Sequence, residues 1–263
     1  ISFKREINFN FFKIDKLFFS PVKSLSFSSV KKLEILDNIG IKFDRNFAFT
    51  RDLDDERIKI ILKNPSERKI INFLSLKHFP ELNEYNFEFD NDILKLKNKD
   101  IVLLSANINN KSDLNLLCDK IKSIIPKVKN IQFLKDAINP FFDTMPSKTI
   151  SMINLNSIKD FEKKLSKQIE YERFRGNIYI DQLEAWEERK LVNKTLIINN
   201  TKFKVLREIP RCSATNIKPN SSISNLSIPM SLKQIYNHIN LGIYLLPLND
   251  GNIRLNDNVL INV

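Results

Sequence analysis

Cys212 is the residue of this chain whose surroundings best suit chemistry. It lies in the segment Ile209-Pro210-Arg211-Cys212-Ser213-Ala214-Thr215, directly after an expected strand and in a stretch without amphipathic periodicity. Pro210 stiffens the approach to the cysteine, and Arg211 places a cation beside the sulfur, which favours the thiolate. A thiolate can act as a nucleophile or as a metal ligand, so the segment predicts one of these roles.

The other cysteine and the two histidines of the chain have simpler explanations. Cys118 falls on the apolar face of an expected helix, where a free thiol behaves as a small buried hydrophobe. A disulfide between Cys118 and Cys212 remains open at this point. A nucleophilic Cys–His pair would use His238, near the C-terminal strands, or His78, in a turn-like segment, although a hydrogen-bonded surface histidine explains each. The chain has no CxxC, HExxH or Cys/His cluster, so no zinc or iron–sulfur site is expected.

Three short segments combine a restricted backbone with cations or hydroxyl groups. They are Ser20-Pro21-Val22-Lys23-Ser24, Phe43-Asp44-Arg45 and Phe174-Arg175-Gly176-Asn177. Taken singly, each describes an ordinary surface cation. Together, Lys23, Arg45 and Arg175 could converge on an anion, because Arg offers two parallel hydrogen bonds to a phosphate and Lys offers a point charge.

The elements that must position these residues are mainly strands. Short β-branched or aromatic runs separated by polar turns predict a mainly β (α+β) protein with few helices. Strands are expected at 14–20, 31–36, 47–51, 58–62, 86–89, 93–96, 101–104, 177–180, 196–198, 202–206, 243–247, 253–255 and 259–263. Turn residues at 90–92, 199–200 and 249–251 are expected to join neighbouring strands as hairpins.

Two helices are expected as well. One carries an apolar face from Leu114 to Ile125, with Ser112 as its N-cap. The other begins near Ser157, which has capping-box spacing to Asp160. The Pro-bracketed loop at 139–146 separates the two helices. It predicts a β-rich N-terminal domain over residues 12–138 and a second domain over residues 139–263.

Charge and hydropathy indicate whether the chain binds nucleic acid or spans a membrane. The net charge is +11, but the lysines are spread along the whole chain without a basic block or an aromatic-interleaved motif. Nucleic-acid binding is therefore not expected, whereas an anionic small molecule or an acidic partner protein is. No apolar run approaches the roughly 18 residues that a membrane span needs, and no signal-peptide core is evident. A cytoplasmic protein is expected.

Taken in order, these segments resemble the MOSC family, named for the C-terminal domain of molybdenum-cofactor sulfurase. Within the family the chain looks closest to the type represented by the mitochondrial amidoxime-reducing component and its bacterial relatives. The resemblance rests on Ser20-Pro21-Val22-Lys23-Ser24, Asp44-Arg45, Asp143-Thr144, Phe174-Arg175-x-Asn177, Glu184-Ala185-Trp186, Pro210-Arg211-Cys212 with Thr215, and Gly242-Ile243-Tyr244 followed by Gly251-Asn252-Ile253-Arg254 and Asp257. Gly176 stands where the family usually has proline, which is expected to loosen that turn.

The resemblance implies a fold and a cofactor. The fold is a β-barrel-like MOSC domain preceded by a β-rich N-terminal domain. The cofactor is the molybdenum cofactor (molybdenum bound to molybdopterin), with the thiolate of Cys212 on the metal. By position, the residues that would hold the pterin and its phosphate are Lys23, Ser24, Arg45, Asp143, Thr144, Arg175 and Asn177, and Arg211 would tune the sulfur.

The resemblance also implies an activity. The chain would be a molybdenum-dependent oxidoreductase that reduces N-hydroxylated small molecules. Electrons would come from a separate ferredoxin-, flavodoxin- or cytochrome-type protein, because the chain offers no flavin, haem or iron–sulfur signature. Two alternatives stay open: a non-catalytic carrier of the molybdenum cofactor or of sulfur, and a basic protein in which Cys212 is structural.

Overall fold

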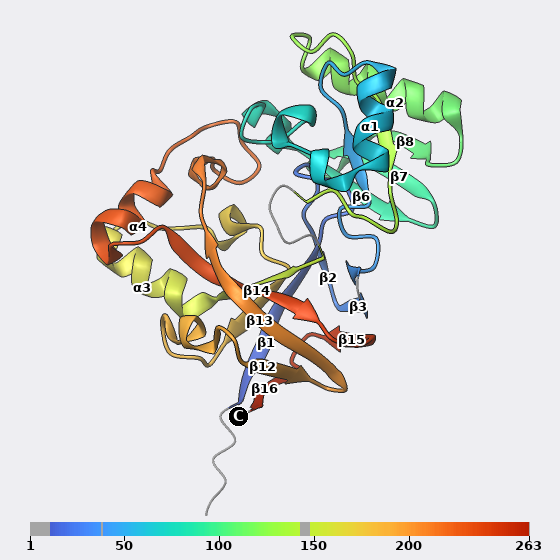
Figure 1. Ribbon diagram of the computed structural model, residues 1–263. Coiled ribbons are helices and arrows are strands. Elements are labelled where there is room, and N and C mark those ends of the chain that lie inside the picture. Colours follow the sequence, from blue (N-terminus) through green and yellow to red (C-terminus); the bar gives the residue numbers. More distant parts are fainter. Residues whose placement is uncertain (1–10, 38, 143–147, 263) are drawn as a thin grey trace, which may run out of the picture.

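A closed β-barrel forms the larger part of the molecule (Figure 1). The structure is a computed structural model that describes residues 11–37, 39–142 and 148–262, so Asp143 and Thr144 lie outside the described residues. Seven of the described strands follow one another around the barrel in the order β11, β10, β14, β13, β12, β16 and β1, and β1 pairs with β11 to close it. Their bounds are β1 Phe11–Phe19, β10 Ile150–Asn154, β11 Ile178–Asp181, β12 Thr195–Ile198, β13 Thr201–Pro210, β14 Asn240–Pro247 and β16 Asn258–Asn262.

The first strand of the barrel comes from the other end of the chain. β1 pairs antiparallel with β11, with Leu17 opposite Ile178, and with β16, with Phe12 opposite Val259. Alternate side chains of β1, among them Phe12 and Ile14, are buried in the barrel core. The N-terminal domain expected over residues 12–138 therefore contributes its first strand to the barrel. Closure pairs every strand on both sides and removes the exposed edges of an open sheet.

The remaining strands extend the barrel on one side and build a second core. β2 (Ser28–Val30) pairs with β1, and β15 (Gly251–Arg254), β3 (Lys32–Leu36) and β4 (Gly40–Ile41) form a small sheet. The second core lies between β6 (Tyr85–Asp90), β7 (Ile93–Asn98), β8 (Ile101–Asn107), α2 (Lys111–Ile124) and the pair of β5 (Phe47–Phe49) with β9 (Phe133–Lys135). α1 (Asp55–Lys63) lies beside it (Figure 1).

Two helices cover the outside of the barrel. α3 (Leu155–Leu165) and α4 (Ile228–Tyr236) lie side by side and bury Phe161 and Leu232 against it (Figure 1). The short 3₁₀ turns are η1 (Pro65–Glu67), η2 (Ile70–Asn72), η3 (Pro80–Glu84), η4 (Tyr171–Phe174), η5 (Glu187–Leu191) and η6 (Ser213–Asn216). No helix of the described residues is long and apolar enough to cross a membrane.

The mainly β fold with a barrel is confirmed, while some local predictions are wrong and some elements were not expected. Residues 58–62 were expected as a strand but lie within α1, whose N-cap Asp54 accepts a hydrogen bond from the backbone N–H of Arg57. β10 was not expected, because its five residues are all buried and lack the polar alternation that marks a half-exposed strand. α4 was not expected either, and the turn at 249–251 leads from β14 to β15, which are not paired with each other.

The predicted N-caps are also wrong by a few residues. Asn110 rather than Ser112 caps α2, since its side chain accepts hydrogen bonds from the backbone N–H groups of Ser112 and Asp113. Asn154 caps α3, and the hydroxyl of Ser157 is instead donated to the buried carboxylate of Glu188. In both helices the side-chain amide of an asparagine directly before the first turn accepts hydrogen bonds from the free backbone N–H groups. The serine further along the chain is therefore not the cap.

Candidate functional site

Cys212 lies on the wall of an open cavity of about 400 Å³. The cysteine is exposed, is not in a disulfide, and precedes η6 as its N-cap residue. Its carbonyl oxygen accepts hydrogen bonds from the backbone N–H and the hydroxyl of Thr215, at 3.1 and 2.8 Å. The backbone of Cys212 is therefore held by its own turn at the wall of the cavity.

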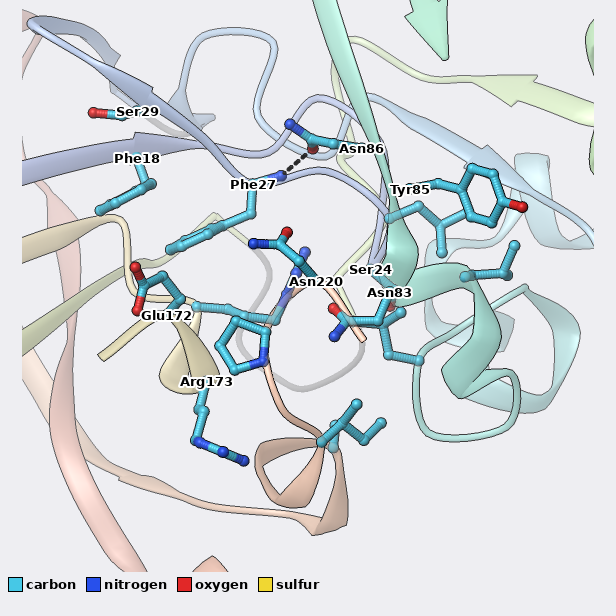
Figure 2. A pocket seen from close by; sticks show the side chains of 17 residues that line it. Phe18, Ser24, Phe27, Ser29, Asn83, Tyr85, Asn86, Glu172, Arg173 and Asn220 are labelled. Atoms are coloured by element: carbon cyan, nitrogen blue, oxygen red, sulfur yellow. Dashed lines mark hydrogen bonds between the residues drawn. The ribbon is translucent and has the colours of Figure 1, made fainter. Parts of the chain in front are cut away.

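Two smaller cavities adjoin this one among the described residues. One, of about 160 Å³, is lined by Arg45, Ser151 and Asn177 and shares Arg175 and Tyr244 with the Cys212 cavity. The other, of about 270 Å³, is lined by Phe27, Asn83, Tyr85, Asn86, Glu172 and Asn220, and shares Ser24 and Arg175 with it (Figure 2). Arg175 thus borders all three cavities.

Three of the predicted binding residues have the left-handed backbone conformation. The φ angles are 62° at Ser24, 55° at Arg45 and 49° at Arg175. This conformation costs a side-chain-bearing residue about 1–2 kcal/mol, and such strain tends to persist at functional sites. The same conformation occurs at other described residues, such as Asp52, Asn91 and Lys99, so it does not by itself assign a function to this region.

Hydrogen bonds bring two of the predicted motifs together at the end of β1. The backbone N–H of Ser20 donates to the buried carboxylate of Asp44 at 2.7 Å, and the N–H of Arg45 donates to the carbonyl of Ser20 at 2.6 Å. Asp44 also forms an ion pair with the side chain of Arg45. Burial raises the pKa of Asp44, and the Arg45 guanidinium partly offsets this effect.

The cations of this region repel one another. Burial, together with the charge of Arg45, lowers the pKa of Arg175 to about 10. The same two causes, burial first, lower the pKa of Lys23 to about 7. Arg45 and Arg175 line the 160 Å³ cavity, whereas Lys23 is buried next to the ring of Phe73 and lines none of the three cavities. An anion near Arg45 and Arg175 would relieve this repulsion.

The low pKa of Lys23 predicts a pH-dependent stability. Between pH 7 and 10.5 the unfolded chain binds more protons than the folded one, so the penalty for burying the charge is full below pH 7 and fades towards pH 10.5. We expect Lys23→Met to raise the free energy of unfolding at pH 6 by a few kcal/mol, since one pKa unit is worth about 1.4 kcal/mol. Urea unfolding of the cofactor-free protein should show this gain shrinking from pH 7 to pH 10. Lys163→Met, on the surface of α3, is the control, and its effect on the free energy of unfolding should not vary with pH. An effect of Lys23→Met that is equally independent of pH would contradict the prediction.

The side chains of two predicted binding residues, Asn177 and Arg211, form hydrogen bonds within the protein. The amide oxygen of Asn177 accepts from the hydroxyl and the backbone N–H of Ser151, at 2.8 and 3.2 Å, and its NH₂ group points to Asp44 and to the carbonyl of Phe18. The guanidinium of Arg211 donates to the carbonyls of Leu241 and Phe174. Both residues line the 160 Å³ cavity, but their hydrogen bonds hold its wall.

Gly176 lies in the turn for which the sequence predicts a looser backbone. The backbone N–H of Gly176 donates to the hydroxyl of Tyr179 at 3.0 Å, a bond that proline could not make. A Cβ at this position would lie 2.5 Å from a side-chain carbon of Ile153. The structure therefore fixes Gly176 by a contact and a hydrogen bond, and the looser turn stays a prediction.

Neither histidine is hydrogen-bonded to Cys212 among the described residues, and Nδ1 of His78 bonds the hydroxyl of Ser75 at 3.0 Å. The ring of His238 packs against Trp186 and Tyr236, and its nitrogens contact Arg189 and the backbone N–H of Asn240. Cys118 lies in α2, where burial raises the pKa of its thiol to about 11. Both cysteines are free, so they do not form the disulfide that spacing had left open.

Sequence reasoning missed Arg173, a buried residue on the wall of the Cys212 cavity. Its guanidinium forms an ion pair with Glu170 at 2.6 Å and donates to the carbonyl of Asn216 at 3.0 Å. The only signal in the sequence is its position directly before Phe174 and Arg175.

The comparison with protein families agrees with this geometry. Residues 141–260 match the family model of the MOSC domain. This part of the chain is a MOSC domain. It contains Arg175 and Cys212, while Ser24 and Arg45 reach the same cavities from the N-terminal part.

Individual relatives of the MOSC domain are distant. Mitochondrial amidoxime reducing component 2 of Rattus norvegicus is 30% identical over 87 residues, which are 33% of this chain and 25% of that protein. The YuaD protein of Bacillus subtilis aligns with a TM-score of 0.45 and 10% identity over 95% of both chains. YiiM of Geobacillus stearothermophilus aligns with a TM-score of 0.36 and 14% identity over 43% of this chain and 54% of its own.

Proposed function

We propose that this MOSC protein is a cytoplasmic, molybdenum-cofactor-dependent oxidoreductase that reduces N-hydroxylated small molecules. One observation carries the proposal. An exposed thiol, Cys212, and two cations in a left-handed backbone conformation, Arg45 and Arg175, line adjoining cavities. A soft thiolate suits molybdenum, and paired guanidinium groups suit a dianionic phosphate at the other end of the cofactor.

The described residues fit such a cofactor chemically. Burial and the nearby charge of Arg45 lower the pKa of Arg175, and a bound phosphate would add negative charge to that of Asp44 beside these two cations. Cys212 would hold the metal, Arg45 and Arg175 the phosphate, and Ser24 would donate a hydroxyl hydrogen. Asp143 and Thr144 remain predicted ligands outside the described residues. When bound, the cofactor would supply a two-electron centre that can accept an oxygen atom.

The protein's own side chains would then orient the substrate and limit water. Phe174, Ile209 and Tyr244 give the Cys212 cavity apolar and aromatic walls, which favour the organic part of a substrate over water. Electrons must arrive from a separate protein. The net charge of +11 favours an acidic donor of the ferredoxin, flavodoxin or cytochrome type.

The decisive experiment is a turnover assay on protein produced in a host that makes the cofactor. Benzamidoxime and a hydroxylamine are offered with reduced methyl viologen, which replaces the unknown donor protein. Formation of the corresponding amidine or amine supports the reductase. Stoichiometric cofactor without turnover of any N-hydroxylated compound would contradict the reductase and favour the carrier.

The substitution Ser24→Gly should affect cofactor binding without lowering the stability of the fold. Glycine adopts a φ of 62° without strain, so the free energy of unfolding should stay constant or rise by about 1 kcal/mol. Loss of the hydroxyl should weaken cofactor binding about tenfold to a hundredfold, since one hydrogen bond to a charged group is worth about 1.5–3 kcal/mol. The amount of pterin that is retained on gel filtration measures this. Ser29→Gly, a change on the wall of the 270 Å³ cavity, is the control, and unchanged retention in Ser24→Gly would remove Ser24 from the site.

A further inference from the structure

The segment that carries Cys212 is fastened to the segment that carries Arg175 from two sides. The first link comes from Arg211, the residue before Cys212. Its Nη1 donates to the carbonyl of Phe174 at 3.0 Å, and its Nε donates to the carbonyl of Leu241 at 2.8 Å. Phe174 precedes Arg175, so this link ties the chain just before the thiol to the chain just before the cation.

The second link runs in the opposite direction. Arg173, in η4, donates from Nη1 to the carbonyl of Asn216 at 3.0 Å and from Nη2 to the side-chain oxygen of Asn225 at 2.8 Å. Asn216 ends η6, the turn that begins directly after Cys212. In Figure 2 the side chain of Arg173 runs away from Phe27 and Asn86. The link therefore ties the chain after the thiol back to η4.

Both guanidinium groups are buried, and although both residues line the Cys212 cavity, their hydrogen bonds go to groups of the protein. Arg173 is 3% exposed and Arg211 is 8% exposed. Burial of a cation is costly unless its donors are satisfied, and the planar fork of arginine satisfies several acceptors in fixed directions. Burial lowers the pKa of Arg211, and only the carboxylate of Glu170 pairs directly with Arg173. The buried guanidinium groups of Arg173 and Arg211 can hold the segments that they bind in a fixed geometry, at the cost of burying a cation.

Gly242 leaves the space that the first link needs. Its φ is 85°, and a Cβ there would lie 2.6 Å from the carbonyl oxygen of Met152 and 3.1 Å from Nη2 of Arg211. The residue before it, Leu241, supplies the carbonyl that Arg211 binds. A side chain at position 242 would push the guanidinium out of place.

We propose that Arg173 and Arg211 are positioning residues that together fix the Cys212 thiol relative to the Arg175 guanidinium. The proposal rests on the proposed function, because the distance between Cys212 and Arg175 would have to match the distance between the metal and the phosphate of one cofactor. We call the two arginine links that set this distance the brace. It assigns Arg211 a role through backbone carbonyls rather than direct contact with the sulfur. Neither arginine needs to touch the cofactor.

The test compares Arg173→Lys and Arg211→Lys with Ile121→Val, a change in the buried face of α2 that lowers stability away from the cavities. Lysine keeps the charge but cannot make forked bonds. Urea unfolding confirms that each variant is folded. The first readout is hydrogen exchange of the Thr215 and Ile217 amides in cofactor-free protein, since both amides bond within η6.

We expect exchange of these two amides to rise about tenfold or more in either lysine variant and to stay unchanged in Ile121→Val. In loaded protein we expect about ten- to hundredfold weaker cofactor retention and a shifted molybdenum electron-paramagnetic-resonance spectrum, as loss of a residue that supports a metal ligand generally produces. The double variant should lose little more than the worse single one, because the two links act on one segment.

Unchanged exchange in η6, or retention and spectra equal to those of Ile121→Val, would overturn the proposal. The outcomes also separate it from the proposed function. A wild-type chain that takes up no cofactor overturns the function, while the exchange comparison still decides whether the brace exists. A wild-type chain that loads normally, beside lysine variants that load equally well, overturns the brace alone.

Discussion

Cys212→Ser is expected to abolish molybdenum binding and turnover while the fold stays intact. A serine hydroxyl does not deprotonate near neutral pH, so it cannot replace a thiolate on a soft metal. Cofactor affinity should fall by more than the roughly 100-fold that loss of a residue behind a metal ligand costs. Because Cys212 is exposed, the free energy of unfolding should change by less than about 0.5 kcal/mol.

The control for this prediction is the second cysteine. Cys118→Ser places a hydroxyl in a mostly buried position of α2, so it should lower stability but leave the molybdenum content unchanged. Molybdenum by elemental analysis and reduction of benzamidoxime are measured on both variants. Full activity in Cys212→Ser would remove the thiol from the metal site.

Arg175→Gly is expected to have the second largest effect, and again without a loss of stability. Glycine relieves the left-handed backbone at a φ of 49°, worth about 1 kcal/mol, which offsets the lost hydrogen bond to the carbonyl of Ser26. The forked bonds to phosphate are lost, and each charge-assisted bond contributes about 1.5–3 kcal/mol. Loss of both bonds of the fork should therefore lower pterin retention by about a hundredfold or more.

Arg175→Lys provides the matched comparison at the same position. Lysine keeps the charge and the backbone strain but loses the fork, so its retention should lie between that of the wild type and that of Arg175→Gly. Equal retention in all three proteins, measured by fluorescence of the oxidised pterin, would show that Arg175 does not bind the phosphate. A large loss of stability in Arg175→Gly would instead indicate a structural arginine.

The convergence of distant motifs could be predicted in part from the sequence. Arg45 and Arg175 border one cavity, in line with the convergence predicted for the cations Lys23, Arg45 and Arg175, whereas Ser24 and Cys212 were joined to this set only by the family resemblance. The physical reason is the antiparallel pairing of β1 with β11, which puts the end of one strand beside the start of the other. Lys23 follows the same strand, but its ammonium group lies over the ring of Phe73. Successive side chains of a strand point to opposite faces, and beyond the end of the strand the local sequence does not determine to which face a side chain points.

Other parts of the site depend on contacts that no local pattern encodes. Arg173 and Arg211 each bind backbone carbonyls 30–43 residues away, and any residue type offers a carbonyl. The left-handed conformations at Ser24, Arg45 and Arg175 likewise carry no sequence signal, since strain of this kind favours glycine or asparagine when only local energy decides. β10 escaped prediction because a fully buried strand lacks polar alternation.

The most direct test of the central claim is the molybdenum and pterin content of wild-type protein from a cofactor-producing host. Elemental analysis gives the metal, and fluorescence after oxidation gives the pterin, with Cys212→Ser measured in parallel. We predict close to one molybdenum and one pterin per chain, with the metal lost in the variant. Absence of both from the wild type, in a host that loads other molybdenum proteins, would contradict the account.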